Sequence, residues 1–209
     1  MADATSLPQA PLPPRRSPLD AVWVAGDYGA AAVGGPGVTM LRRSGLSSVQ
    51  LDARRGTAAS LRAAVAGALG LALPGPGRAA SGGEVRALWL GPDRWMLLAE
   101  DTFALEAKLR AAAEPAGGVV VDQSHGRTIL RLSGPAVREV LAKGTGVDLH
   151  PRAFAEDAVA QTGLFHLAVT LDRRRGTGTF DVHGMRGFAQ SLFESLCEAA
   201  AEFGYRLSE

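Results

Sequence analysis

Two successive parts of this 209-residue chain show the same order of strand-like and helix-like segments. Alternating or continuous apolar runs predict strands, and apolar residues that recur every four positions predict helices. Both parts, 46–122 and 126–207, follow the order strand, helix, strand, strand, helix, strand. This is the order of a split βαβ unit of ferredoxin-like type. The chain is therefore predicted to be an α+β protein built from two ferredoxin-like βαββαβ halves.

The individual segments give the expected boundaries. In the first part we expect strands at 46–53, 85–90, 95–99 and 119–121, with helices at 57–69 and 103–113. In the second part we expect strands at 127–132, 161–171, 179–182 and 205–207, with helices at 135–141 and 188–203. Gly and Pro clusters predict loops at 26–37 and 74–83. Five prolines in the first 20 residues favour a disordered start. The predicted organisation is a disordered Pro-rich segment at 1–25, a first α+β half at 26–122 and a second α+β half at 123–209.

Composition restricts the class of protein and its partners. Hydrophobic residues make up 46% of the chain and charged residues 21%, which is typical of a globular protein. The net charge of +1 is too small to hold a polyanion, so nucleic acid is not an expected partner. No run reaches the roughly 18 to 20 apolar residues of a membrane-spanning helix. The single cysteine, Cys197, cannot form an internal disulfide, which favours a reducing compartment and predicts a cytoplasmic protein.

The predicted hairpin of the first half is apolar on both faces. Neither 87–90 nor 95–99 alternates between apolar and polar residues, so both faces of these strands should be covered. One face can receive the helices of the same half. The other face should meet either the second half of the chain or another protein. In the latter case Trp89, Arg94 and Trp95 would be the interface anchors.

Polar residues gather at the joint between the two halves, in Asp122-Gln123-Ser124-His125-Gly126. A serine beside a histidine is compatible with nucleophilic catalysis, but the Gly-x-Ser-x-Gly turn that exposes an attacking serine is missing. We expect a turn instead, in which Asp122 or Ser124 accepts backbone N–H groups and Gly126 supplies a permissive φ. No catalytic residue is assigned.

Other charged and metal-ligating residues give weaker patterns. The run Arg173-Arg174-Arg175 lies at a predicted hairpin tip, where solvated charge is expected and contact with an acidic partner is the alternative. The four histidines lack the spacing of a metal site, and no metal is expected on this chain. These histidines are His125, His150, His166 and His183.

Three segments together resemble a known family. They are Leu-Trp-Leu-Gly-Pro-Asp-Arg-Trp-Met-Leu-Leu at 88–98, Val-Asp-Gln-Ser-His-Gly-Arg-Thr at 121–128, and the stretch from Leu-Ser-Gly-Pro-Ala at 132–136 to Asp-Leu-His-Pro-Arg-Ala-Phe at 148–154. Their order and spacing are similar to those of the gamma subunit of heterotetrameric sarcosine oxidase, and the similarity extends from about residue 46 to residue 203.

This resemblance implies a subunit of a flavoenzyme complex with alpha, beta, gamma and delta chains. Such a complex oxidises sarcosine to glycine, passes the methyl carbon to tetrahydrofolate and yields hydrogen peroxide; without folate, it releases formaldehyde. The resemblance implies no cofactor on this chain, with FAD, FMN, NAD, zinc and tetrahydrofolate on the partner chains. The expected role is therefore assembly and stabilisation, without catalytic residues.

The Asp-x-Ser-His and Gly-Pro-Ala segments are also similar to the folate-binding fold of aminomethyltransferases. Those enzymes show an Asp-Asp pair on a following strand, where this chain offers only Asp181. Two alternatives follow. The chain could be a stand-alone folate-dependent transferase that uses Asp122, His125 or Asp181 as an acid or base. It could also be the gamma subunit of a related oxidase of another N-methyl amino acid.

Overall fold

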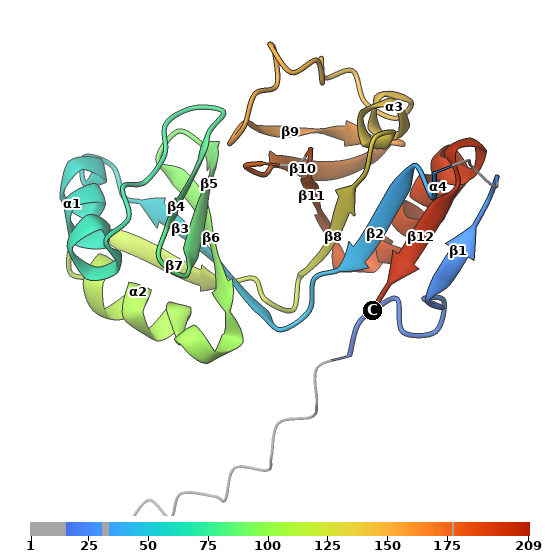
Figure 1. Ribbon diagram of the computed structural model, residues 1–209. Helices are drawn as coiled ribbons and strands as arrows, with labels where there is room; N and C mark the ends of the chain where they lie inside the picture. The colour runs from blue at the N-terminus through green and yellow to red at the C-terminus, as the bar shows by residue number, and fades with distance from the viewer. Residues whose placement is uncertain (1–15, 31–33, 177) are drawn as a thin grey trace, which may run out of the picture.

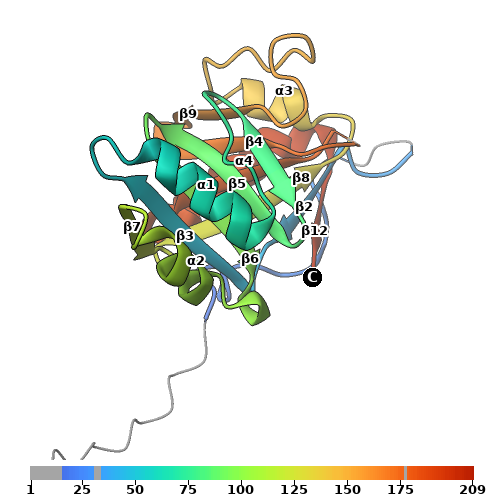
Figure 2. The same cartoon turned by 90° about the vertical axis from the view of Figure 1, so that its left-hand side faces the viewer.

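The computed structural model describes residues 16–30, 34–176 and 178–209. Two β-sheets lie face to face, and each carries helices on its outer side (Figure 1). Figure 2 shows α1 and α2 in front of the first sheet, with the second sheet behind it. The predicted α+β fold with two halves is confirmed. Among the described residues, no helix is both long and apolar enough to cross a bilayer.

The first half contains a five-stranded antiparallel sheet in the order β4-β5-β6-β3-β7. Without the edge strand β4, this is the strand order of a ferredoxin-like unit. Strand β4 lies inside a segment that was predicted to be a loop. The elements are β3 (Leu46–Ala53), α1 (Ala58–Leu69), β4 (Ala79–Gly82), β5 (Val85–Gly91), β6 (Arg94–Glu100), η1 (Asp101–Phe103), α2 (Leu105–Ala113) and β7 (Gly118–Asp122).

The second half contains a seven-stranded sheet in the order β1-β12-β2-β8-β11-β10-β9. Its elements are β8 (Arg127–Ser133), α3 (Val137–Ala142), β9 (Val159–Leu164), β10 (Leu167–Arg173), β11 (Phe180–Met185), η2 (Arg186–Phe188), α4 (Ala189–Ala200), η3 (Ala201–Phe203) and β12 (Tyr205–Ser208). The N-terminal strands β1 (Gly26–Tyr28) and β2 (Val38–Arg42) complete this sheet.

The position of β2 differs from the predicted division of the chain, which placed 26–122 in the first half. β2 lies between β8 and β12, antiparallel to the first and parallel to the second. Its apolar residues explain this position, because Val38 and Met40 point to one face and are fully buried in the core of the second half.

The predicted disordered segment 1–25 is also partly wrong. Residues 1–15 lie outside the described residues, but 16–25 packs against the second half. Leu19 is fully buried, and Trp23, one helical turn later, is only 8% exposed. The Trp23 ring lies 5.2 Å from that of Phe193, and its indole N–H donates to the Ser208 carbonyl at 3.1 Å. Two large apolar side chains on one side of a turn therefore anchor this segment.

The predicted single strand at 161–171 is a hairpin of β9 and β10. Its two-residue turn consists of Phe165 and His166, whose φ angles are 49° and 66°. Turns with two left-handed residues usually contain Asn or Gly, and neither residue occurs here, so no local pattern indicated the turn. The Phe165 ring packs where a Cβ on Gly144 would stand, which helps to hold the turn.

The two sheets meet through a small apolar cluster. Leu88, Met96 and Leu98 of the first half pack with Ile129 and Val159 of the second. The second apolar face of the β5–β6 hairpin is therefore covered by the same chain, which confirms the intrachain alternative.

The predicted interface anchors take three different positions. Trp95 is fully buried under α1 and α2, and its indole N–H donates to the Pro74 carbonyl at 2.9 Å. The expectation that Trp95 anchors an interface is therefore wrong. Trp89 is half-buried against the same core, while Arg94 is exposed and pairs with Asp52.

Candidate functional site

The chain passes between its two halves at two neighbouring crossings, one from β2 to β3 and one from β7 to β8. Backbone hydrogen bonds join them. The Arg43 N–H donates to the Ile129 carbonyl at 2.9 Å, and the Gln123 N–H donates to the Ser48 carbonyl at 2.7 Å. The joint is therefore held by backbone contacts, and it places the polar segment 122–126 beside the start of β3.

This polar segment forms a turn around the Asp122 carboxylate. The Ser124 N–H donates to Asp122 Oδ1 at 2.8 Å, and the Ser124 hydroxyl donates to the same oxygen. The Ser48 N–H donates to Ser124 Oγ at 3.0 Å, which ties the turn to β3. Among the described residues, no hydrogen bond joins the Ser124 hydroxyl to the His125 ring. The geometry is that of a structural turn and not of a serine–histidine pair.

Gly126 differs from its predicted role in this turn. Its φ is not in the left-handed region, so the turn does not require a permissive backbone at this position. Its N–H donates to the Gln123 carbonyl at 2.9 Å. A Cβ added at Gly126 would lie 3.1 Å from Gln123 Oε1, which is the end of a flexible side chain that can move aside.

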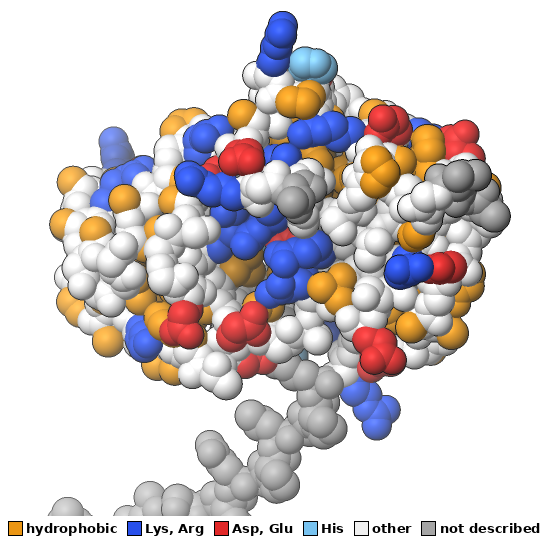
Figure 3. All heavy atoms as spheres, viewed as in Figure 1, with side chains coloured by type: hydrophobic (Ala, Val, Ile, Leu, Met, Phe, Trp, Pro, Cys, Tyr) orange, Lys and Arg blue, Asp and Glu red, His pale blue; other side chains and the backbone are white. Residues whose placement is uncertain are grey.

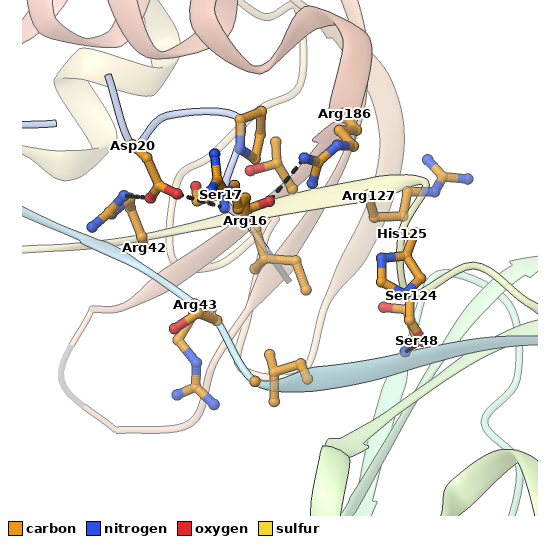
Figure 4. A pocket seen from close by; sticks show the side chains of 16 residues that line it. Arg16, Ser17, Asp20, Arg42, Arg43, Ser48, Ser124, His125, Arg127 and Arg186 are labelled. Carbon is orange, nitrogen blue, oxygen red and sulfur yellow. Dashed lines mark hydrogen bonds and ion pairs between the residues drawn. The ribbon is translucent and has the colours of Figure 1, made fainter. Parts of the chain in front are cut away.

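A pocket of about 300 Å³ opens beside the turn (Figure 4). Ser124 and His125 line it, together with Leu46 and Ile129 and part of the N-terminal segment. Its lining is rich in positive charge, whereas Asp20 is the acidic residue in it. Five arginines line the pocket: Arg16, Arg42, Arg43, Arg127 and Arg186.

The arginines around the pocket differ in their partners. Arg42 pairs with Asp20 at 2.7 Å, and Arg43 pairs with Glu100 at 3.1 Å. Arg127 forms no ion pair or side-chain hydrogen bond within the described part of the chain, and its Nε is buried without a partner. Burial lowers the pKa of Arg127, because no nearby carboxylate offsets the loss of water.

A second, much smaller cavity of about 10 Å³ lies between the sheets, lined in part by Ser48, Arg127, Thr170 and His183. This volume is about that of one water molecule. His183 is only 4% exposed, and its Nε2 is buried without a partner among the described residues. Burial lowers the pKa of His183, although the nearby carboxylates of Asp172 and Asp181 act in the opposite direction.

Buried charges connect the two sheets next to this cavity. Arg86 on β5 donates from Nε to Asp172 Oδ2 on β10 at 2.7 Å, and from Nη1 to Asp157 Oδ1 at 3.0 Å. Arg131 on β8 binds Asp181 on β11 through two hydrogen bonds of 2.7 Å. Figure 3 shows Lys and Arg side chains gathered in a hollow in the middle of the face where the halves meet.

Asp172, Asp181 and His183 have the chemistry of metal ligands, with potential ligand atoms within 4.8 Å of one another. Both carboxylates, however, already accept hydrogen bonds from arginines. Burial by itself would raise the pKa of Asp181, but its hydrogen bonds with Arg131 and the nearby positive charges lower it. The arrangement is complete as a network of ion pairs, and its residues do not fit a cation.

The structure separates the residues that were considered as catalytic. Ser124 and His125 line the pocket, and Asp122 holds the turn beside it. Asp181 is not among the residues that line the pocket and lies in the buried charge network instead. The three acid or base candidates, Asp122, His125 and Asp181, therefore do not form one site.

The expectation of solvated charge at 173–175 is wrong for two of the three arginines. Arg173 is 6% exposed, and its guanidinium lies 5.2 Å from the centre of the Phe180 ring. Arg174 reaches the charge network, 3.6 Å from Asp172 and 3.8 Å from Asp181. Arg175 is exposed and pairs with Asp157. Arg174 is therefore held by two buried carboxylates, whereas Arg173 is held by the Phe180 ring and by the carbonyls of Arg174 and Thr179.

Comparisons of the amino-acid sequence with known proteins all match the same family. The model of the sarcosine oxidase, gamma subunit family matches residues 54–202. The sarcosine oxidase subunit gamma of Corynebacterium sp. (strain U-96) is 35% identical over 210 residues, covering 97% of this chain and 95% of that relative. The sarcosine oxidase subunit gamma of an Arthrobacter species is 36% identical over 191 residues, covering 90% of this chain and 91% of the relative.

Solved structures agree. A chain of the heterotetrameric sarcosine oxidase from Corynebacterium sp. U-96, in complex with pyrrole 2-carboxylate, has a TM-score of 0.73 and 32% identity, covering 90% of this chain and 96% of that chain. The glycine cleavage system aminomethyltransferase T from Bartonella henselae has a TM-score of 0.60 and 19% identity, covering 82% of this chain and 48% of that chain. At 19% identity, the similarity to the aminomethyltransferase shows a shared fold and nothing about function.

Proposed function

Because the chain belongs to the sarcosine oxidase gamma subunit family, we propose that it is the gamma subunit of a heterotetrameric sarcosine oxidase. The observation that carries this proposal is the likeness to a chain of a heterotetrameric sarcosine oxidase, which covers 90% of this chain and 96% of that one. Similarity over at least 90% of the chain supports the same role in an assembly.

The proposed partners are alpha, beta and delta chains. The complex would oxidise sarcosine with dioxygen as the electron acceptor, giving glycine and hydrogen peroxide, and would transfer the methyl carbon to tetrahydrofolate. FAD, FMN, NAD and zinc, together with tetrahydrofolate, would be bound by the partner chains. We place the complex in the cytoplasm, in keeping with the single cysteine of this chain.

The role of this chain would be assembly and stabilisation. Its conspicuous polar residues have structural tasks: Asp122 and Ser124 build the turn at the joint, and Asp181 is paired with Arg131. The substrate of the complex is proposed to be sarcosine, since the names of the relatives specify it. The fold shared with the aminomethyltransferase does not by itself give this chain a transferase activity.

The contact with the partners is proposed to use exposed apolar side chains, because their burial would contribute most of the binding free energy. Trp95 cannot take part, since it is buried within its own half. The larger exposed apolar side chains of the described residues are Val24, Tyr28, Val119, Val121, Met185 and Phe188. Val119 and Val121 belong to β7, one of the two edge strands of the first sheet.

Co-expression tests the proposal. The chain, carrying an affinity tag, is produced together with candidate alpha, beta and delta chains encoded in the same genome. We expect the four chains to purify in equal amounts and to oxidise sarcosine, and we expect the complex without this chain to be less stable. A chain that stays monomeric in the presence of all three partners, with no change in their activity, would contradict the proposal.

A further inference from the structure

The pocket at the joint holds more positive charge than the neighbouring acids neutralise. Five arginines line it, against Asp20 in the lining and, outside it, Glu100 and the Asp122 of the turn. The ion pairs of Arg42 and Arg43 involve carboxylate side chains that are 53% and 58% exposed, and such pairs contribute little to stability and are screened by salt. A pocket of this kind favours a negatively charged occupant.

Arg127 is the strongest single indication. It lies at the start of β8 and lines both the pocket and the small cavity between the sheets. Its guanidinium has no acidic partner among the described residues, and its Nε is buried without a hydrogen bond. Burial also lowers the pKa of Arg127, so that the charged group is poorly compensated by this chain alone. An oxyanion offers two acceptors in the geometry that a guanidinium prefers.

Arg186 is a second donor on the same side of the pocket. Its backbone N–H donates to the Gly126 carbonyl at 2.9 Å, which fixes η2 against the turn at the joint. Its Nη2 donates to the Arg16 carbonyl at 2.8 Å, a neutral partner. Figure 4 shows Arg127, Arg186 and His125 along one side of the pocket, opposite the Arg42–Asp20 pair.

We infer that this pocket binds a small oxyanion, an organic carboxylate or a phosphate, through Arg127 and Arg186. The volume of about 300 Å³ lies at the lower end of the range of small-molecule sites. Pro18, Leu46 and Ile129 supply apolar wall next to the arginines, which suits the carbon skeleton of an organic carboxylate. The inference goes beyond an assembly role, because a complex can form with this pocket filled or empty.

The test uses the assembled complex and maps arginine reactivity. Phenylglyoxal modifies accessible guanidinium groups, and peptide mass spectrometry gives the rate at each arginine. The reaction is run with inorganic phosphate, with malonate, and with sodium chloride at the same ionic strength. We expect phosphate or malonate to slow modification of Arg127 and Arg186 several-fold relative to chloride, and to leave the exposed helix residue Arg110 unchanged.

The outcomes separate the sources of the ligand. Protection by malonate alone supports an organic carboxylate, protection by phosphate alone supports a phosphate, and protection by both supports a general oxyanion site. Equal rates in all three salts would overturn the inference. It would also be overturned if Arg127 and Arg186 were inert in every salt, because a partner chain would then cover the pocket.

A variant gives a second readout. Calorimetric titration of the protecting anion into complexes with Arg127→Gln should show binding weakened by about tenfold or more, as expected for loss of a charged hydrogen bond. Arg110→Gln is the matched control and should bind as the original complex does. If Arg127→Gln prevents assembly, the phenylglyoxal modification rates of the unaltered complex decide whether the inference holds. If no complex forms at all, the proposed function fails, and protection is then measured on the isolated full chain.

Discussion

Arg86 of the first sheet and Asp172 of the second meet in the interior between the two halves, with 2.7 Å between Nε and Oδ2. A second guanidinium nitrogen of Arg86 also donates to this carboxylate, and both side chains are almost completely buried. The halves are therefore joined by charge as well as by the apolar cluster around Leu88.

Removing one partner of this pair should be costly. In Arg86→Met, Asp172 and Asp157 keep their buried carboxylates but lose the guanidinium that donates hydrogen bonds to both. We expect the free energy of unfolding to fall by about 3–5 kcal/mol. Urea titration followed by tryptophan fluorescence measures this. Arg110→Gln, which removes two exposed ion pairs on the first half, is the control and should leave the urea midpoint nearly unchanged. An equal loss of unfolding free energy in both variants would contradict the stabilising role of the buried ion pairs.

His183 should make stability depend on pH. Burial lowers the pKa of His183 below its ordinary value of 6.5, so the unfolded chain binds more protons at this site than the folded chain just below pH 6.5. Stability is therefore expected to fall as the pH drops below 6.5, by up to about 1.4 kcal/mol per pH unit from this group. His183→Gln should flatten this part of the profile, and His166→Asn, at an exposed turn, should not. The measurement is the urea midpoint from pH 7 to pH 5.

Leu19 and Trp23 should control the attachment of the N-terminal segment. Leu19→Ala removes a fully buried side chain and is expected to cost about 2–5 kcal/mol. Loss of this anchor should also speed tryptic cleavage after Arg16, followed by mass spectrometry. Val24→Ala changes a neighbouring apolar residue that is 64% exposed and should alter neither property. If cleavage after Arg16 stays slow in Leu19→Ala, Trp23 alone is sufficient to hold the N-terminal segment on the second half.

Met185 and Phe188 offer a test of the proposed partner surface. They are 43% and 57% exposed, so a substitution there should not disturb the core. Met185→Glu with Phe188→Glu is expected to weaken association with the partner chains by at least about tenfold, because each buried apolar anchor contributes more than about 1 kcal/mol. Ala107→Glu and Ala111→Glu on α2 introduce the same charges elsewhere. Size-exclusion chromatography of the co-expressed chains compares the two double variants. Unchanged assembly of the Met185→Glu, Phe188→Glu variant would show that the partner contact lies elsewhere.

The elements that were predicted correctly are those with strong local signals. The β5–β6 hairpin has Pro92 and Asp93 at its turn, and α1 has Leu61 and Val65 on one buried face. The missed elements lack such signals. β2 follows a Gly-Gly-Pro-Gly loop and is only five residues long, so its place depends on neighbours that are distant in sequence. The β9–β10 turn uses Phe165 and His166, which are held by packing and not by their intrinsic preference.

The candidate site was predicted only in part, for a similar reason. The polar segment at 122–126 was visible as a turn at the joint, but the arginines around it come from the N-terminal segment, from β2 and the connection after it, and from β8 and η2. Their meeting follows from the sheet order, which a single sequence does not reveal. A partial signal existed in β8, where Arg127 and Arg131 alternate with the buried Thr128, Leu130 and Leu132 and therefore share one face.

The place of β2 between β8 and β12 also sets the order in which the protein can be completed during synthesis. Residues 46–122 hold every strand of the first sheet, so this half can close as soon as it has left the ribosome. β2 is translated before that half, yet both of its neighbours follow it much later. Nascent chains therefore carry β2 without a neighbouring strand until β8 emerges, and with only one of its two neighbours until β12 follows. This interval is the one in which a chaperone would have most to protect.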